Sequence, residues 1–254
     1  MGIVNVTPDS FSDGGRFYSS DQALDHARRL IDAGADALDI GGESTRPGAQ
    51  AVSEQEELER ILPVLEGLRD CGVTLSVDTM KPAVMRAALA AGATMINDVR
   101  ALQAPGALEA VRNSDCAVCL MHMQGEPRSM QDAPQYGDVL QEVYGFLAAR
   151  IAACGAAGVA RDRLYIDPGF GFGKTLEHNL ALLRGLPRLA ELAPVLVGVS
   201  RKRMLGEITG RPVDERLAGS IAAALRAVEK GAAIVRVHDV AATVDALKIW
   251  ERTR

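Results

Sequence analysis

The segment AGADALDI (residues 33–40) returns in related form twice, as AGATMIND (91–98) and KGAAIVRV (230–237). In each copy a glycine stands between a stretch with helical spacing and an apolar run. Glycine adopts the left-handed conformation of a helix C-cap without a Cβ clash, so this pattern is typical of a helix that ends and leads into a strand. The sequence therefore predicts a repeated helix-to-strand joint.

The repeat also aligns three polar residues. Counting five residues past each glycine gives Asp39, Asn97 and Arg236. If the three units are equivalent, these side chains occupy the same level of three strands and point the same way, into the interior. Burying such groups unpaired costs on the order of several kcal/mol each, which disfavours chance placement. The alternative is internal polar pairing that merely fills the interior.

Eight short segments of β type can be found along the chain. Most are continuous apolar runs, as expected for parallel strands that are covered on both faces. They span residues 3–6, 37–42, 74–79, 94–99, 117–123, 164–167, 195–200 and 234–238. Strand and helix alternate eight times, although the helical piece near 105–111 is short. We predict an α/β fold, a (β/α)₈ TIM barrel forming a single domain over residues 1–254, with a doubly wound open sheet as the alternative.

Helix starts support this alternation. Ser53-x-x-Glu56 forms a capping box ahead of leucines at helical spacing, and Ser19-x-x-Gln22 predicts a second helix start. Pro82 directly precedes an alanine-rich stretch and suits a first helical position.

Composition and charge narrow the class of protein. Of the 254 residues, 48% are hydrophobic and 24% are charged, as in an ordinary folded domain. No apolar run reaches the ~18 residues of a membrane span, and the N-terminus lacks the layout of a secretory signal. We therefore expect a cytoplasmic protein. The net charge of −5 disfavours nucleic acid or an anionic membrane surface as a partner.

Polar residues gather at the ends of the predicted strands, where the active sites of such barrels lie. Asp78 closes the third strand and Asp167 the sixth. Carboxylates there can accept paired N–H bonds from a flat heterocycle, although an aspartate at a strand end can also simply cap the next turn. A basic set suited to a phosphate or diphosphate follows on the same rim. Its members are Arg46, Arg201, Lys202, Arg236 and His238.

The segment PGFGFGKT (168–175) nearly matches a phosphate-binding loop, G-x-x-x-x-G-K-[ST]. Pro168 stands where that pattern requires glycine, so we reject the match. A glycine-rich turn beside a ligand is the better interpretation, with Phe170 or Phe172 as an aromatic wall.

A dedicated metal site is not expected from the cysteines or histidines. Cys116 and Cys119 lie at the start of an apolar run that predicts a strand, where residues three apart point to opposite faces, so they cannot chelate one ion. Of the four histidines, His26 and His178 are expected on helix surfaces, and His122 is expected to line the barrel.

Five motifs in order resemble the dihydropteroate synthase family of pterin-binding enzymes. They are NVTPDSFSDGG (5–15), DIGGESTRPG (39–48), DPGFGFGK (167–174), SRK (200–202) and RVHD (236–239). The resemblance runs from Gly2 to nearly the end of the chain. It implies a (β/α)₈ barrel that condenses (7,8-dihydropterin-6-yl)methyl diphosphate with 4-aminobenzoate, giving 7,8-dihydropteroate and diphosphate. The route is dissociative: diphosphate leaves, and the amine attacks a pterin methyl cation.

The resemblance also implies roles for individual residues. The pterin pocket is formed by Asp78, Asn97, Asp167 and Lys202, with Asp39 nearby. Phe172 and Val237 are also expected to bind substrate. The diphosphate is held by Thr45, Arg46, Arg236 and His238, and Asn5 binds a bridging Mg²⁺. The aminobenzoate is held by Phe11, Asp13, Pro47 and Ser200. The residues expected to act in catalysis are Asp78, Asp167, Lys202, Arg236 and His238.

Further properties follow from the same resemblance. It implies a cytoplasmic homodimer that acts in folate biosynthesis and is a target of sulfonamides. Family members usually carry a segment ahead of the first strand, so the resemblance also implies a segment ahead of Met1. Met204 departs from the aromatic residue common at its position. Rival interpretations are a non-catalytic pterin-binding paralogue, a methyltransferase barrel using methyltetrahydrofolate, and a generic phosphate-binding aldolase or isomerase.

Overall fold

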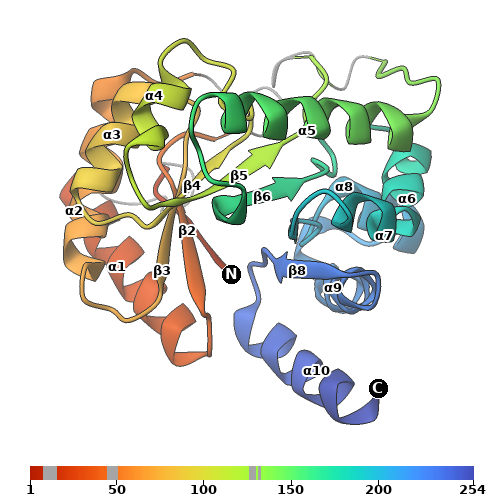
Figure 1. Cartoon of the computed structure of the whole chain (residues 1–254). Helices are drawn as coiled ribbons and strands as arrows, with labels where there is room; N and C mark the ends of the chain where they lie inside the picture. The colour runs from red at the N-terminus through yellow and green to blue at the C-terminus, as the bar shows by residue number, and fades with distance from the viewer. Residues whose placement is uncertain (8–15, 45–50, 126–129, 131–132) are drawn as a thin grey trace.

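The computed structural model describes residues 1–7, 16–44, 51–125, 130 and 133–254 (Figure 1). Strands and helices alternate along these residues. The strands are β1 (Gly2–Asn5), β2 (Ala37–Gly41), β3 (Thr74–Asp78), β4 (Met95–Asp98), β5 (Ala117–Met121), β6 (Leu164–Asp167), β7 (Val195–Val197) and β8 (Ala232–Val235). The helices are α1 (Arg16–Asp32), α2 (Glu54–Leu68), α3 (Pro82–Ala90), α4 (Ala107–Arg112), α5 (Val139–Ala156), α6 (Leu176–Arg184), α7 (Leu186–Ala190), α8 (Arg203–Thr209), α9 (Leu217–Glu229) and α10 (Val240–Thr253), with 3₁₀ turns η2 (Arg161–Arg163) and η3 (Val213–Glu215).

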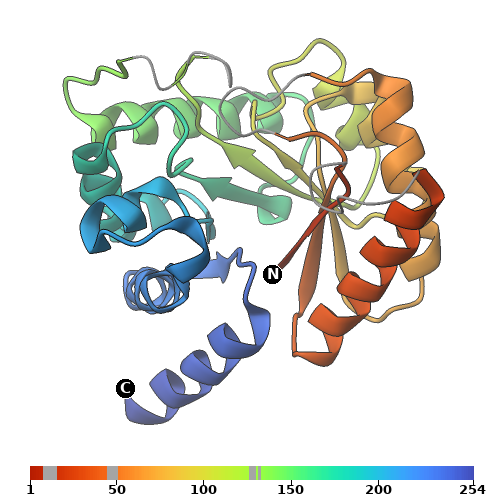
Figure 2. The same ribbon diagram turned by 180° about the vertical axis from the view of Figure 1, so that it is seen from behind.

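The sheet is parallel throughout, and its eight strands lie side by side in chain order. It is strongly curled, and the helices cover its outer face (Figures 1 and 2). The first and last strands also approach each other. The amide of Ile3 donates to the carbonyl of Val237 over 3.1 Å, and the amide of Val237 donates to the carbonyl of Met1 over 3.0 Å. Eight parallel strands alternating with helices are confirmed.

Some predicted boundaries were wrong. Strand β8 ends at Val235, so Arg236 and His238 lie just beyond the strand rather than on it. Helix α1 begins at Arg16, which places Ser19 inside the helix and removes its predicted role as a helix start. The other two helix starts are confirmed, because the Ser53 hydroxyl accepts from the Glu56 amide over 3.1 Å and Pro82 opens α3.

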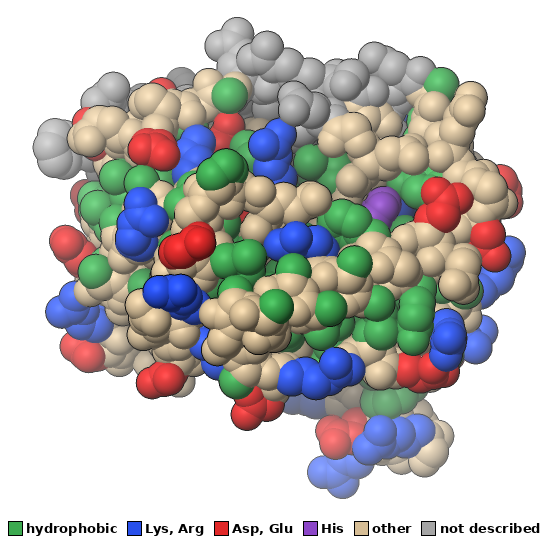
Figure 3. Space-filling view, turned by 45° about the horizontal axis from the view of Figure 1, so that its top comes forward, with side chains coloured by type: hydrophobic (Ala, Val, Ile, Leu, Met, Phe, Trp, Pro, Cys, Tyr) green, Lys and Arg blue, Asp and Glu red, His purple; other side chains and the backbone are tan. Residues whose placement is uncertain are grey.

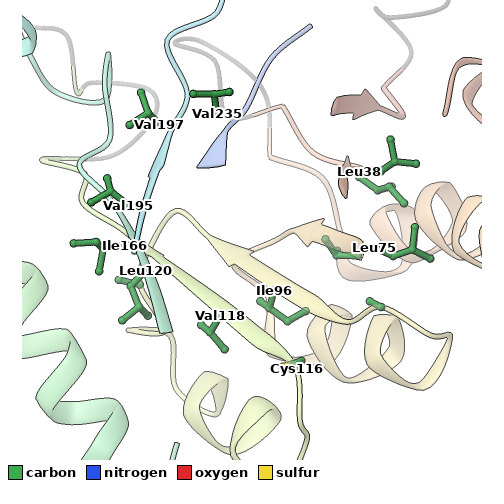
Figure 4. Packing of buried hydrophobic residues seen from close by; sticks show 14 of the residues in the cluster. Leu38, Leu75, Ile96, Cys116, Val118, Leu120, Ile166, Val195, Val197 and Val235 are labelled. Carbon is green, nitrogen blue, oxygen red and sulfur yellow. The ribbon is translucent and has the colours of Figure 1, made fainter. Parts of the chain in front are cut away.

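The main core fills the space between the sheet and its helices. Figure 4 shows apolar side chains of successive strands on this outer face, among them Leu38, Leu75 and Ile96. Neighbouring residues on a strand point to opposite faces, so Asp39 and Asn97 point to the inside of the curl. There they lie on the same face as a small apolar cluster of Met95, Cys119 and Leu196.

Helix α2 shows how much this outer core stabilises the fold. Leu65 lies on its buried face and is 0% exposed. We expect Leu65→Ala to lower the free energy of unfolding by about 2–5 kcal/mol, because it removes buried methyl groups and leaves a cavity. Leu217→Ala, at a leucine that is 42% exposed, is the matched control. Urea unfolding that gave equal losses for both variants would contradict this assignment of the core.

Candidate active site

A buried carboxylate on β2 is the centre of the site. Asp39 Oδ1 accepts from Ser76 Oγ over 2.6 Å. Its Oδ2 accepts from Asn97 Nδ2 over 3.0 Å and from Arg236 Nε over 2.5 Å. The three residues aligned by the sequence repeat therefore meet in one buried cluster. Their mutual pairing is also what the alternative of internal polar pairing requires.

Two acceptor oxygens near this cluster have no hydrogen-bond partner within it. Asp78 Oδ2 accepts from Arg236 Nη2 over 3.2 Å, but the other oxygen, Asp78 Oδ1, is buried without a hydrogen-bond partner among the described residues. Asn97 Oδ1 is in the same condition. A buried acceptor that lacks a hydrogen bond costs about 1–3 kcal/mol of stability. Two such acceptors side by side are well suited to the N–H groups of a ligand.

The register of the strands explains why the acceptors of Asp78 and Asn97 lie next to each other. Asn5 pairs with Gly41, Gly41 with Asp78, and Asp78 with Asn97 in successive strand pairs. They form one row across the carboxyl ends of β1 to β4. Gly41 has no side chain, so the row leaves room between Asn5 and Asp78.

The pKa values of the two strand-end carboxyl groups are raised. Desolvation by burial, helped by the negative charge of Asp39, raises the pKa of Asp78 to about 7 against the opposing effect of Arg236. Burial likewise raises the pKa of Asp167, opposed by the charge of Lys202 and by the Gly169 amide that donates to Oδ1 over 2.7 Å. Perturbed acids that converge in this way are typical of active sites.

Lys202 supplies a cation to the same site. Its ammonium donates to the Phe170 carbonyl and lies 4.8 Å from the centre of the Phe172 ring. Burial lowers the pKa of Lys202 to about 8, and the charge of Asp167 opposes this decrease. Phe172 is therefore the aromatic wall of the site, whereas Phe170 is fully buried in the core.

The segments after β7 and β8 are joined to each other. The Ser200 hydroxyl lies 3.0 Å from His238 Nδ1 and accepts from the His238 amide over 3.2 Å. Next to this contact, Arg201 forms two hydrogen bonds with Asp239, of 3.0 and 2.5 Å. This fixes Ser200, His238 and the backbone of Val237 at the edge of the cluster that contains Arg236.

The family model described as "Pterin binding enzyme" matches residues 1–238. The chain belongs to this family.

Named relatives agree with this membership of the pterin-binding enzymes. The "Dihydropteroate synthase" of Haemophilus influenzae is 52% identical over 257 residues, which cover 100% of this chain and 93% of the relative. A solved structure of the Xanthomonas albilineans dihydropteroate synthase with 4-aminobenzoic acid is 58% identical, with a TM-score of 0.95, and covers 100% of this chain and 92% of its own. The Burkholderia cenocepacia dihydropteroate synthase complexed with 7,8-dihydropteroate is 55% identical, with a TM-score of 0.92 and coverage of 100% and 90%.

Some residues predicted for this pterin-binding enzyme lie outside the described residues. They are Phe11, Asp13, Thr45, Arg46 and Pro47. The remaining predicted residues are described, and the clusters around Asp39, Lys202 and His238 contain all of them except Asn5, which ends β1.

A magnesium ion would find few protein ligands here. Within the described part of the chain, no three His, Cys, Asp or Glu side chains gather to hold a metal ion. Asn5 offers one amide oxygen beside the open position at Gly41. Mg²⁺ commonly keeps several waters and binds through substrate phosphates, so a single protein ligand fits an ion that arrives with a diphosphate.

The sequence interpretation missed the environment of one buried pair. Lys174 Nζ lies 3.0 Å from His122 Nδ1, and both side chains are buried. Other histidine expectations hold only in part. His26 is half-buried with Nε2 3.2 Å from the Ile3 carbonyl, and His178 completes a capping box with Thr175.

None of the helices in the described part of the chain could span a bilayer.

Proposed function

We propose that this pterin-binding enzyme is a dihydropteroate synthase, which joins (7,8-dihydropterin-6-yl)methyl diphosphate to 4-aminobenzoate. The C–O bond to the diphosphate breaks, a C–N bond forms to the amine, and the amine loses a proton. The observation that carries the proposal is similarity over the whole chain to synthases whose structures hold 4-aminobenzoic acid or 7,8-dihydropteroate.

Asp78, Asn97, Asp167 and Lys202 would bind the pterin. The unsatisfied oxygens of Asp78 and Asn97 suit the N–H edge of a pterin, because carboxylate and amide oxygens accept such bonds in a fixed geometry. Asp39 would act through Asn97 and Arg236, which it orients. Phe172 would line the wall beside Lys202.

The departing diphosphate would be stabilised by the cationic side of the cluster. Arg236 and His238 would hold it with Thr45, Arg46 and the Val237 backbone, a preorganised contribution that acts as charge develops. Asn5 would hold a Mg²⁺ bound to the diphosphate, and such an ion supplies charge neutralisation. The negative charges of Asp78 and Asp167 would favour a pterin cation, which supports the dissociative route.

The second substrate would approach from the neighbouring side. Ser200, with Phe11, Asp13 and Pro47, would hold the aminobenzoate. The Ser200 hydroxyl lies against His238, which brings this proposed contact next to the diphosphate group. No covalent nucleophile is required by this chemistry.

We also propose that the curled sheet closes into a (β/α)₈ barrel, forming one domain over residues 1–254. The hydrogen bonds between Met1–Ile3 and Val237, and the bridge between Gly2 and Val237, support closure. A cytoplasmic homodimer is proposed from the family resemblance alone. Figure 3 shows cationic and anionic side chains interspersed over the visible face, which favours small-molecule substrates over nucleic acid.

Two rivals predict different behaviour. A non-catalytic paralogue would bind pterin without turnover, and a methyltransferase barrel would have no use for Arg236 and His238 beside each other. The test is diphosphate release with both substrates, compared with release when each is omitted. The proposal expects release coupled to formation of dihydropteroate. Diphosphate release that requires neither the pterin diphosphate nor the aromatic amine would exclude the proposed synthase activity.

The pH dependence of kcat/KM should reflect the protonation of Asp78. Its folded-state pKa of about 7 means that the carboxylate is present above pH 7 and gains a proton as the pH falls through that value. A protonated carboxyl accepts fewer bonds from a pterin, so kcat/KM for the pterin diphosphate should fall about tenfold per pH unit below about 7. A flat profile from about pH 8 to about pH 6 would contradict this role.

A further inference from the structure

A buried lysine lies near the proposed pterin pocket, in addition to the partly buried Lys202. Lys174 is 3% exposed, and its Nζ lies 3.0 Å from His122 Nδ1, 3.0 Å from the Phe172 carbonyl and 3.4 Å from the His122 carbonyl. It forms no ion pair with a carboxylate among the residues that the structure describes. Burial lowers the pKa of Lys174 to about 7, and the negative charge of Asp167 opposes this decrease. Keeping a lysine in such a place is costly and calls for a specific role.

The protonation states of this pair follow from burial. Desolvation, with the charge of Lys174, lowers the pKa of His122 to about 3, so its imidazole is neutral near pH 7 and Nδ1 can accept. The His122 ring also packs nearly perpendicular to the ring of Phe146, with ring centres 4.9 Å apart. Lys174 therefore has a rigid acceptor at the end of β5.

The lysine ties a glycine-rich loop to that point. A Cβ added at Gly169, where φ is +71°, would lie 1.8 Å from the His122 carbonyl oxygen. One added at Gly173 would lie 2.4 Å from the Gln124 carbonyl oxygen. Only glycine allows the loop backbone to pack this closely against the residues after β5. The Tyr136 hydroxyl adds a bond of 2.9 Å to the Gly173 carbonyl.

The same loop makes the contacts that locate Lys202. Between the two close-packed glycines lie Phe170, whose carbonyl accepts from Lys202, and Phe172, whose ring lies under its ammonium. Asn179 holds the middle of the loop by accepting from the Gly171 amide over 2.8 Å. Lys174 anchors its end through the Phe172 carbonyl.

From these contacts we infer that Lys174, bound to His122, is a positioning residue that determines where Lys202 presents its ammonium to the pterin. The inference rests on the proposed function, because Lys202 is taken to contact the pterin. It assigns Lys174 no contact with substrate. The competing role is a clamp that only stabilises the fold.

The decisive measurement is the affinity for 6-hydroxymethylpterin, a pterin that cannot react. Lys174→Met should raise its dissociation constant about tenfold, because the loop that locates Lys202 loses its anchor. KM for the pterin diphosphate should rise similarly, and KM for aminobenzoate should change less than about twofold. Lys174→Gln keeps two N–H donors without the charge and should be less affected.

The matched control removes an equivalent clamp at the other end of β6. Arg163 donates to the carbonyls of Cys116 and Val111 over 2.8 and 2.9 Å. Arg163→Met should lower the melting temperature and leave pterin affinity unchanged. His122→Gln keeps an acceptor for Lys174, so it should retain most of the affinity.

Distinct results identify distinct failures. If Lys174→Met binds pterin as tightly as the wild-type chain while its melting temperature falls, Lys174 is only a stabilising clamp. If Lys174→Met does not fold, His122→Ala replaces it as the test, because it removes the acceptor of Lys174. Pterin affinity in His122→Ala equal to that of the wild-type chain overturns the inference. A wild-type chain that binds no hydroxymethylpterin overturns the proposed function instead.

Discussion

Arg236→Ala is expected to lower kcat by about 10²–10³-fold, the usual effect of removing one preorganised charge-stabilising donor. Arg236 is the one cation that contacts both Asp39 and Asp78 among the described residues, and it lies directly after β8 beside the proposed diphosphate position. Steady-state diphosphate release at saturating concentrations of both substrates measures the effect. Turnover at the wild-type rate would refute the assignment.

Stability has to be separated from catalysis in this variant. Asp39 is fully buried, and losing its partner can cost about 3–5 kcal/mol of stability because a buried charge is left uncompensated. The double variant Arg236→Ala with Asp39→Asn removes that charge. If the double variant regains stability but turns over more slowly than Asp39→Asn alone, the catalytic role of Arg236 is supported. If both recover, Arg236 acts only by neutralising Asp39.

The control is an arginine on the neighbouring segment. Arg203 follows Lys202 by one residue, but its side chain is 82% exposed and pairs with Glu207 at the surface. Such pairs contribute about 0–1 kcal/mol. Arg203→Ala should therefore leave both kcat and stability close to wild type.

The repeat in the sequence predicted the central cluster for a physical reason. A glycine cap fixes where each helix ends, and the two-residue period of a strand then directs Asp39 and Asn97 inward. Arg236 lies one residue past the end of β8 and contacts Asp39 from there. Asp39, Asn97 and Arg236 therefore meet although up to 197 residues separate them. Neither step requires knowledge of long-range contacts.

Other features depend on contacts that a single segment does not contain. The sequence after Val235 continues a β-type pattern, but the backbone there turns to pair with Met1 and Ile3, so the end of β8 was misjudged. Lys174 closes the motif at 167–174, but the sequence pattern predicts no role of its own for this lysine. Its contact with His122 joins residues 52 apart in the chain and could not be inferred from spacing.

Asp78→Asn is expected to weaken binding of the pterin by about 10²–10⁴-fold. A hydrogen bond to a charged group contributes about 1.5–3 kcal/mol, and Asp78 offers a carboxylate that could accept two from the pterin edge. An asparagine replaces one acceptor oxygen by an NH₂ group, which faces the N–H groups of the ligand. Binding of 6-hydroxymethylpterin at about pH 8 measures the loss.

Stability should move in the opposite direction, which makes the result diagnostic. Because the folded-state pKa of Asp78 lies above its ordinary value, the folded state holds an extra proton between about pH 4 and about pH 7 and loses stability as the pH rises through that window. The amide introduced by Asp78→Asn does not titrate, so the variant should be at least as stable as wild type at about pH 8. Lower affinity with undiminished stability would then reflect lost recognition, not unfolding.

The matched control is Asp98→Asn on the next strand. Asp98 is fully buried, whereas the side chain of Asp78 is 12% exposed. The two oxygens of Asp98 accept from the amides of Arg100 and Leu102, both over 2.8 Å, and hold a turn in which Ala101 and Leu102 have positive φ. Its replacement should lower stability and leave pterin affinity within about threefold of wild type. Equal loss of affinity in both variants would mean that any buried charge near the carboxyl ends of β3 and β4 affects the pocket. The affinity data would then give no evidence that Asp78 itself binds the pterin.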